Sequence, residues 1–335
     1  MTDPFSQIDK VELHQHVDGS IPVEVTWELM QEHGLAPVDS IEEMRRLLVL
    51  QSSEEGTLLD YLDKFHYPLW VTQFYGNLTY VTFRIAEAAY AQGVRALELR
   101  YSPTIHTYAG LTVRQAITSV LAGLNKARRE LPGFHAGLIV VAMRQMGPHI
   151  AKILARAALA EAQHLHDRTG VIGFDIAGAE RGNPPRLFRE AFDIARRGQL
   201  GLTIHAGEVE DAWAVWQAVD EVGCDRIGHG SSAVEDKVLL RRLARDRICV
   251  ECCFTSNYQT RAVAPGKPHP IARFLEAGVP VAICTDNTTV SHTDMLRECE
   301  MIAEQIGEDA VVEILRHTHR HSFISDVRRW PVNGR

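Results

Sequence analysis

Apolar and polar residues alternate along the chain in a pattern that predicts short buried strands separated by amphipathic helices. Eight segments rich in valine, isoleucine and leucine have the composition of strands, and they cover residues 10–16, 94–101, 135–143, 171–177, 200–205, 226–229, 248–253 and 279–285. Stretches such as LTVRQAITSVLAGLNKARREL and PHIAKILARAALAEAQHLHD lie between them and have apolar residues at helical spacing. This alternation predicts an α/β fold in which eight parallel strands form a (β/α)8 TIM barrel.

The connection between the first two predicted strands is far longer than an ordinary βα loop, so it must contain helices of its own. We expect residues 1–335 to form a single domain with a helical, lid-like insertion over residues 22–90. Within it, TLLDYLDKFHYPLWVTQFYGN places four apolar residues on one helical stripe: Leu59, Leu62, Phe65 and Leu69. The stripe either packs on the barrel or covers a site at the end of the first strand.

The overall charge limits the classes of partner. The 335 residues include 35 lysines and arginines and 43 aspartates and glutamates, which gives a formal net charge of -8. The basic residues form no long run, so we expect neither nucleic acid nor an anionic membrane to be the main partner. A small, neutral substrate fits this composition better.

The chain start and the cysteines indicate the compartment. MTDPFSQIDK is polar and acidic, and it lacks the basic start and apolar core of a secretory signal, so a cytoplasmic location is expected. No apolar run approaches the length of a membrane span. The six cysteines contain no CxxC pair and are expected to be reduced, mostly buried thiols, while the last residues, 321–335, are expected to fray.

The stretch VELHQHVDGS sets two histidines at the end of the first predicted strand. Side chains on a strand alternate between its faces, so His14 and His16 point the same way while Gln15 points oppositely. Two imidazoles on one face can share a metal ion, although two ordinary histidines at a strand end are the alternative.

Three further strand ends carry residues of the same chemistry, in the segments TIHAGE, RIGHG and ICTDN. Barrel closure aims all strand ends at a common centre, where TIM-barrel sites are built. Zinc favours imidazole nitrogen and carboxylate oxygen and leaves a position for water in catalytic sites. The predicted metal ligands are His14, His16, His205 and Asp286. Singly, His205 could be a satisfied core histidine and Asp286 could start a turn.

Two more titratable residues follow these strands. Glu208 comes three residues after His205, and under a lid its carboxyl group could have a raised pKa and shuttle protons. Its alternative role is that of an acidic residue in the first turn of a helix. His229 in IGHG could hold the attacking hydroxide and stabilise charge on the new oxygen, or it could be a fifth ligand.

Together these residues give the sequence a close resemblance to the adenosine deaminase family of the metal-dependent amidohydrolase superfamily. KVELHQHVDGS, GFDIAGAE, TIHAGE, RIGHG and TDN match its motifs in order, and the similarity spans essentially the whole chain. The resemblance implies a (β/α)8 barrel with one zinc ion per chain, held by His14, His16, His205 and Asp286. It also implies hydrolytic deamination of adenosine or 2'-deoxyadenosine to the 6-oxopurine nucleoside with release of ammonia.

The resemblance further assigns roles to individual residues. It makes Glu208, His229 and Asp286 catalytic: Glu208 protonates purine N1, and His229 orients the hydroxide that attacks C6. The remaining assignments concern substrate binding: His16 and Asp18 face the substrate with Asp18 on the ribose side, the backbone of Gly178 meets purine N3, and Tyr61, Leu62 and Phe65 form an apolar gate.

One position departs from the family pattern. Asn287 stands where the commonest pattern has a second aspartate that hydrogen-bonds purine N7. An amide NH2 donates to that acceptor at any pH, so purine recognition is retained while the preferred base is open. Cys284 and the following TTVSHT also differ from the usual continuation.

Three alternatives compete with this interpretation. A related 6-aminopurine, such as adenine, aminodeoxyfutalosine or an AMP-like compound, could be the substrate. A different amidohydrolase with two metals usually has a lysine in strand four, but VIGFDIAG contains none. A non-catalytic descendant is disfavoured because all six candidate metal and catalytic positions are filled by suitable residues.

Overall fold

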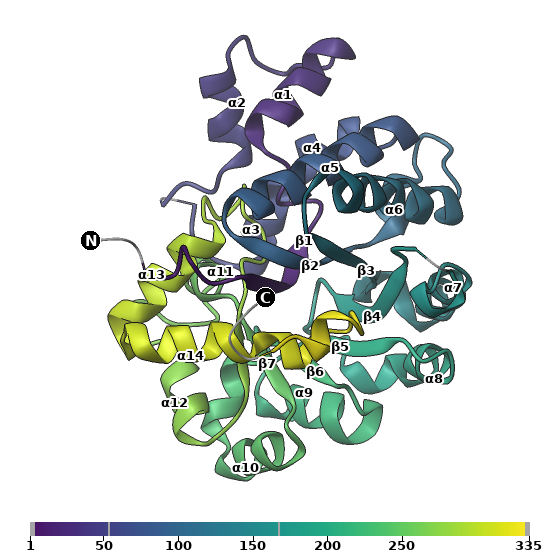
Figure 1. The fold of residues 1–335 in the computed structure, drawn as a ribbon. Helices are drawn as coiled ribbons and strands as arrows, with labels where there is room; N and C mark the ends of the chain where they lie inside the picture. The colour runs from purple at the N-terminus through teal and green to yellow at the C-terminus, as the bar shows by residue number, and fades with distance from the viewer. Residues whose placement is uncertain (1–3, 53, 167, 332–335) are drawn as a thin grey trace.

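The computed structural model describes residues 4–52, 54–166 and 168–331 and contains one eight-stranded parallel sheet. The strands follow chain order around the sheet: β1 (Lys10–His16), β2 (Val94–Tyr101), β3 (His135–Met143), β4 (Val171–Ala177), β5 (Gly201–Ala206), β6 (Arg226–His229), β7 (Cys249–Cys252) and β8 (Val281–Ile283). Next to β8, the Asp286 nitrogen donates to the His14 carbonyl oxygen over 2.8 Å, and an isolated parallel bridge joins Gln15 to Asp286. These contacts bring the two edges together, so the predicted (β/α)8 barrel is confirmed (Figure 1).

Helices surround the strands, as Figure 1 shows. Those between later strands or after the last one are α6 (Val113–Glu130), α7 (Gly147–Ala160), α8 (Arg189–Arg197), α9 (Ala212–Trp216), α10 (Lys237–Asp246), α11 (Phe254–Gln259), α12 (Ile271–Glu276), α13 (Met295–Ile306) and α14 (Glu308–Thr318). Shorter helical turns are η1 (Pro103–His106), η2 (Arg144–Met146), η3 (Gln163–Leu165), η4 (Pro185–Phe188), η5 (Gln217–Val222), η6 (Ser231–Glu235), η7 (His319–His321) and η8 (Val327–Arg329). Within the described part of the chain, every helix is too short or too polar to span a bilayer.

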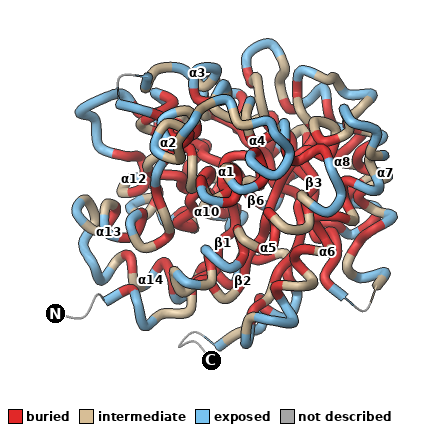
Figure 2. The backbone as a smooth tube through the Cα atoms, turned by 90° about the horizontal axis from the view of Figure 1, so that it is seen from above, coloured by how far each residue is buried: buried red, intermediate tan, exposed pale blue. Residues whose placement is uncertain are grey.

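Local sequence explains where these helices begin. The side chain of Thr112 accepts from the Gln115 nitrogen and Gln115 reciprocates, which forms a capping box at the start of α6. At the start of α10 the Asp236 side chain alone caps the helix by accepting from the Val238 and Leu239 nitrogens. Each helix then turns an apolar stripe toward the strands, so the buried residues form a continuous layer between sheet and helices (Figure 2).

The long connection after β1 contains α1 (Val23–Glu32), α2 (Ile41–Leu48), α3 (Leu58–Asp63), α4 (His66–Val71) and α5 (Tyr75–Ala91). The predicted single stripe is wrong, because TLLDYLDKFHYPLWVTQFYGN forms two short helices and Leu59 is 68% exposed. Pro68 has no N–H to donate to the Lys64 carbonyl, so one helix cannot continue through this point. The break leaves Phe65 between α3 and α4.

The C-terminal segment seals the amino-terminal end of the barrel. Ile324 and Val327 are buried and pack with Val11, Leu13 and other residues that point into the barrel. The expectation that residues 321–335 fray is therefore wrong for 321–331, and residues 332–335 lie outside the described part. The error arose because the segment is polar overall, while its few apolar residues are the ones that contact the barrel. All six cysteines are buried, as expected.

A glycine allows α6 to approach α5 closely. A Cβ atom on Gly123 would lie 2.6 Å from the Thr79 carbonyl oxygen and 2.6 Å from Thr82 Cβ. We expect Gly123→Ala to lower the free energy of unfolding by about 1–3 kcal/mol, because the clash with backbone outweighs the roughly 1 kcal/mol that alanine gains in helix propensity. Urea denaturation measures this difference.

Gly76→Ala provides the matched control in α5. No atom lies within 4 Å of the position that its Cβ would take. This variant is expected to be neutral or more stable by up to about 1 kcal/mol. Equal unfolding midpoints for the two variants would show that the α5–α6 contact is not tight.

Candidate active site

Three histidines meet at the carboxyl end of the barrel. His14 and His16 lie on the same face of β1, and His205 lies near the end of β5. His16 Nε2 is 3.3 Å from His14 Nε2 and 3.2 Å from His205 Nε2. The three residues can each offer one nitrogen to a single metal ion, since the three atoms lie within 4.8 Å of one another.

Asp286 adds an oxygen to this group. Its Oδ1 is 3.6 Å from His14 Nε2 and 3.4 Å from His16 Nε2, and its Oδ2 accepts a 2.6 Å hydrogen bond from Ser256. Asp286 has a left-handed backbone, with φ of 60°, three residues after the end of β8. It therefore turns back toward β1 and does not simply start a surface turn.

Buried carboxylates contact two of the imidazoles on the side that faces away from the cluster. His14 Nδ1 is 2.7 Å from Glu251 Oε2, and His205 Nδ1 is 3.0 Å from Asp175 Oδ2. Each contact occupies Nδ1 and leaves Nε2 directed at the cluster, the arrangement that orients metal-ligating histidines.

Charge and burial keep these imidazoles neutral. Burial lowers the pKa of all three histidines well below the usual value. The positive charge of Arg100 lowers the pKa of His14 further, and neighbouring imidazoles contribute at His16 and His205. A neutral imidazole has a free lone pair, so the group fits a divalent transition metal.

Sequence reasoning missed the charged residues that support this cluster. Arg100 on β2 donates to Asp175 over 2.9 Å and to Glu251 over 3.0 Å, and all three side chains are fully buried. Arg226 on β6 donates to the other Glu251 oxygen over 2.6 Å. A charged residue inside an otherwise apolar strand, as in VIGFDIA and CVEC, could have indicated these ion pairs, because a buried charge must be paired.

Glu208 lies beside the histidines on the turn after β5. Its Oε2 is 3.7 Å from His229 Nε2, and its Oε1 accepts from Thr260 over 3.2 Å. Burial, followed by the negative charge of Glu180, raises the pKa of Glu208 to about 8, so the carboxyl group holds a proton at neutral pH. Helix α9 begins only at Ala212, which excludes a first-turn role for Glu208.

Another glutamate that the sequence analysis did not identify fixes the conformation of the turn after β5. Glu180, the last residue of the GFDIAGAE motif, accepts hydrogen bonds from the backbone nitrogens of Gly207, Val209 and Glu210 over 2.6, 2.8 and 3.0 Å. These bonds fold the turn around the Glu180 carboxylate and fix where the Glu208 backbone lies. The motif contained the signal, but its role depends on a contact between β4 and β5 that the sequence does not reveal.

His229 faces the same cluster from the end of β6. The Asn257 amide donates to His229 Nδ1 over 2.9 Å, which leaves the ring proton of the neutral imidazole on Nε2. Its ring centroid is 5.0 Å from that of His14 and 5.1 Å from that of His205. Like Asp286 it has a left-handed backbone, with φ of 62°.

Cys253 forms a second candidate ligand set with His14 and His229. Burial raises the pKa of Cys253 well above its usual value. The thiolate that a metal requires is therefore disfavoured, so the set with His16 and His205 is the better candidate.

A small cavity of about 70 Å³ adjoins the cluster, and all predicted site residues except His14 line it. Tyr61, Leu62 and Phe65 enter from α3 and its end, with the Tyr61 hydroxyl 2.6 Å from Ser291 Oγ. The cavity is small, because ligand pockets are usually about 300–1,000 Å³, and residues of α3 form one of its sides.

Polar groups stand at the edges of the cavity. Asp18 Oδ1 is 2.7 Å from Nε2 of His106, a buried histidine that sequence reasoning missed because nothing in YSPTIHTY marks it. Asn287 Nδ2 donates to Asp286 over 2.7 Å, while its buried Oδ1 has no hydrogen-bond partner among the described residues. Gly178 has φ of 90°, and a Cβ there would lie 2.6 Å from Gln145 Oε1.

The chain is similar to known adenosine deaminases over almost its whole length. The adenosine deaminase family model matches residues 9–332. An adenosine deaminase from Shewanella loihica is 32% identical over 328 residues, with 97% of each chain covered. A probable adenosine deaminase from Dictyostelium discoideum is 33% identical over 325 residues, which are 96% of this chain but only 41% of that protein.

Solved structures share the fold. An adenine deaminase from Arthrobacter aurescens has a TM-score of 0.85 at 27% identity, covering 96% of this chain and 95% of that one. An amidohydrolase from Burkholderia ambifaria with bound zinc has a TM-score of 0.84 at 23% identity, with coverage of 96% and 87%. An N6-methyl-AMP deaminase from Arabidopsis thaliana has a TM-score of 0.79 at 23% identity, with coverage of 96% and 94%.

Proposed function

The chain belongs to the adenosine deaminase family, and from this premise we propose that it catalyses the zinc-dependent hydrolytic deamination of adenosine and 2'-deoxyadenosine. The products are inosine or 2'-deoxyinosine and ammonia. The observation that carries the proposal is that three histidines meet in one cluster, with Glu208 and His229 beside them and a small cavity adjoining the cluster. Family membership supports the reaction class, an amidine-hydrolysing deaminase, and this geometry supports the assignment of roles.

Four residues would hold one zinc ion per chain: His14, His16, His205 and Asp286. When bound, zinc acts as a Lewis acid that makes water nucleophilic at neutral pH. Glu251 and Asp175 would keep the ligating nitrogens in place, because each contacts the Nδ1 atom on the far side of an imidazole.

Glu208 and His229 would be the hydrogen donors of the reaction, Glu208 to the purine and His229 to the attacking oxygen. Glu208 gives its proton to purine N1, which makes C6 more electrophilic. The oxygen of water bonds to C6, while His229 Nε2 donates to that oxygen and stabilises its charge. Of the two protons of that water, one restores the Glu208 carboxyl group and the other reaches N6. The C6–N6 bond then breaks with its electron pair on nitrogen, and ammonia leaves.

The insertion over residues 22–90 would act as a lid in a single-domain protein. A cavity of about 70 Å³ is too small for a purine nucleoside, so the α3 segment must move for the substrate to enter. Tyr61, Leu62 and Phe65 would then close over the base and exclude bulk water.

Polar residues at the cavity edges would recognise the substrate. His16 and Asp18 would face it, with Asp18 accepting from a ribose hydroxyl. Asn287 would donate its second amide hydrogen to purine N7, since the first is used by Asp286. The backbone of Gly178 would approach purine N3, as a residue without a side chain can.

Adenine is the second candidate substrate. The adenine deaminase from Arthrobacter aurescens is 27% identical to this chain, and a free base needs less room in the small cavity than a nucleoside does. A nucleotide is disfavoured because Asp18 would repel a phosphate on the ribose side.

A panel of 6-aminopurines followed by ultraviolet absorbance tests the proposal. Adenosine and 2'-deoxyadenosine are expected to give the highest kcat/KM, with adenine lower and AMP lowest. Higher kcat/KM for adenine would replace the proposed substrate with the free base. No ammonia from any member of the panel would overturn deamination itself, and the Glu208→Gln variant controls for contaminating activity.

A further inference from the structure

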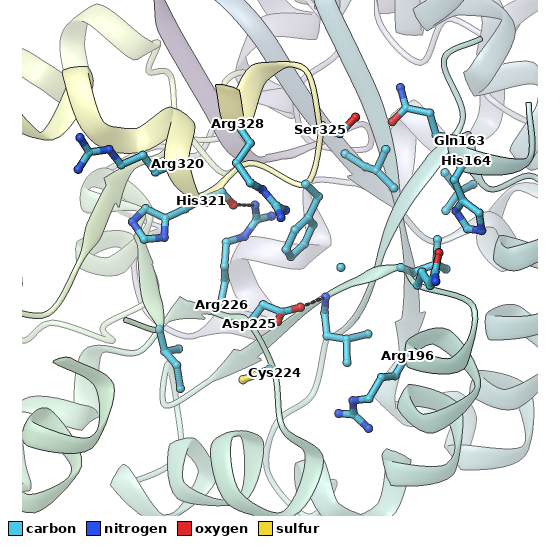
Figure 3. Close-up of a pocket in the computed structure, with 18 of the residues that line it drawn as sticks. Gln163, His164, Arg196, Cys224, Asp225, Arg226, Arg320, His321, Ser325 and Arg328 are labelled. Carbon is cyan, nitrogen blue, oxygen red and sulfur yellow. Dashed lines mark hydrogen bonds between the residues drawn. The ribbon is translucent and has the colours of Figure 1, made fainter. Parts of the chain in front are cut away.

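A second cavity, of about 1010 Å³, lies at the opposite, amino-terminal end of the barrel (Figure 3). Its lining includes the first residues of three strands, Val171, Gly201 and Arg226, and Ile248 just before β7. Residues of the C-terminal segment 320–328 complete it. We call it the floor cavity. This end of a TIM barrel usually serves stability and not catalysis, so the floor cavity has no part in the proposed deamination.

The floor cavity is strongly basic in a chain that is acidic overall. The described residues that line it include eight arginines and three histidines but only three aspartates, while the whole chain has a formal net charge of -8. Positive charge is thus concentrated at one place, which favours an anionic ligand.

Several of these arginines are not occupied by acidic neighbours. Four of the eight arginines form ion pairs with acidic residues: Arg168, Arg196, Arg226 and Arg242. Within the described residues 4–52, 54–166 and 168–331, Arg247, Arg320 and Arg328 form none. They come from separate segments, the turn between α10 and β7 and the C-terminal segment. Their guanidinium groups keep hydrogen-bond donors available for a ligand.

One of these arginines, Arg226, is held in place by contacts with the C-terminal segment. Arg226 is buried, its guanidinium lies 3.7 Å from the centre of the Phe323 ring, and it donates to the His321 carbonyl oxygen over 2.8 Å (Figure 3). Burial, followed by the charges of Arg226, Arg247 and Arg320, lowers the pKa of His321 to about 4. The lowered pKa of His321 is consistent with several arginines lying close to its imidazole.

We propose that the floor cavity binds an oligophosphate, a chain of linked phosphoryl groups such as inorganic tripolyphosphate or the phosphate chain of a nucleoside triphosphate. Guanidinium groups match phosphoryl oxygens through paired hydrogen bonds. A single phosphate can meet only a few of the arginines, whereas a chain of them can reach donors on several segments of so large a cavity. Three aspartates also line the cavity and would repel phosphoryl groups. The ligand is therefore expected to lie beside the arginines.

Titration calorimetry on the zinc-loaded full chain, at low ionic strength, tests this proposal. The probes are tripolyphosphate, GTP, whose base lacks a 6-amino group, and inorganic phosphate. One-to-one binding of tripolyphosphate, of GTP or of both supports the site, and their relative affinities distinguish an inorganic chain from a nucleotide. Binding of neither, or equal binding of inorganic phosphate, overturns it.

Charge reversal locates the site. The double variant Arg247→Glu/Arg320→Glu is expected to weaken binding by about tenfold or more and to leave the basal deamination rate unchanged, which also shows that it folds. Arg273→Glu/Arg189→Glu makes the same change in net charge at exposed positions outside the cavity and should bind as the wild type does. Equally weakened binding in both double variants would show that overall charge, and not the floor cavity, determines binding, and it would overturn the proposal.

The His321 imidazole gives a second, local measurement by NMR. Besides Arg226, Arg247 and Arg320, the groups that act on it include His319. A bound oligophosphate adds negative charge and favours the imidazolium, so the pKa of His321 should rise from about 4. An unchanged His321 pKa in protein saturated with tripolyphosphate would place the ligand elsewhere.

Discussion

Replacing His205 with alanine is expected to remove the metal and to reduce ammonia release to background. Nε2 of His205 is 3.2 Å from Nε2 of His16, so its loss opens one side of the ligand set. Three ligands then remain, and Asp175 is left buried beside an empty space with one contact fewer. Elemental analysis should give about one zinc per chain in the wild type and near zero in His205→Ala. A chelator should abolish wild-type activity, and added zinc should restore it.

His164→Ala is the control for this experiment. His164 is an exposed histidine that lines the floor cavity at the other end of the barrel. Its variant should keep both zinc and turnover, which excludes a general effect of losing an imidazole. Full activity of the wild type without stoichiometric metal would defeat the proposed mechanism.

Glu208→Gln is expected to lower kcat by about 100- to 10,000-fold while zinc content stays at the wild-type level. Glutamine preserves the shape of the side chain and its bond with Thr260, but it has no carboxyl proton to give to N1. The rate of the wild type should also fall as the pH rises above about 8, because the protonated form of Glu208 is present only below its pKa. Steady-state kinetics across pH measures both effects.

Glu210→Gln is the matched control two residues along the same turn. Glu210 is partly exposed and lies 3.5 Å from Arg181, away from the histidines. Its variant should retain the wild-type rate. Loss of zinc from Glu208→Gln would mean that Glu208 is a ligand and not an acid, and would contradict its assignment.

The sequence could predict the barrel and much of the site because both follow from local rules. Two-residue spacing on a strand placed His14 and His16 together, and closure of the barrel brought His205 and Asp286 to them. Strand ends were less accurate: β8 spans Val281–Ile283 where 279–285 was expected. Pro280 and Cys284 on either side of β8 still form single backbone hydrogen bonds to β7, so the exact end of the strand is poorly defined by apolar spacing.

Contacts between distant strands could not be predicted in the same way. Glu251 and Asp175 were visible as charges in apolar strands, but their partners depend on the register of β2, β4 and β7. The break between α3 and α4 depends on Pro68, and the wrong single stripe came from apolar spacing alone. The C-terminal segment packs through a few apolar residues, so its average polarity was misleading.

The left-handed backbone at His229 and Asp286 limits how this protein can be made more robust. For residues with a Cβ atom that conformation costs of the order of 1–2 kcal/mol, and glycine would adopt it freely. Directed evolution that screens for thermal tolerance alone would therefore reward glycine at the two positions that supply an imidazole and a carboxylate to the proposed reaction centre. Screens on this scaffold need a catalytic readout at every round, since resistance to heat and turnover favour opposite residues there.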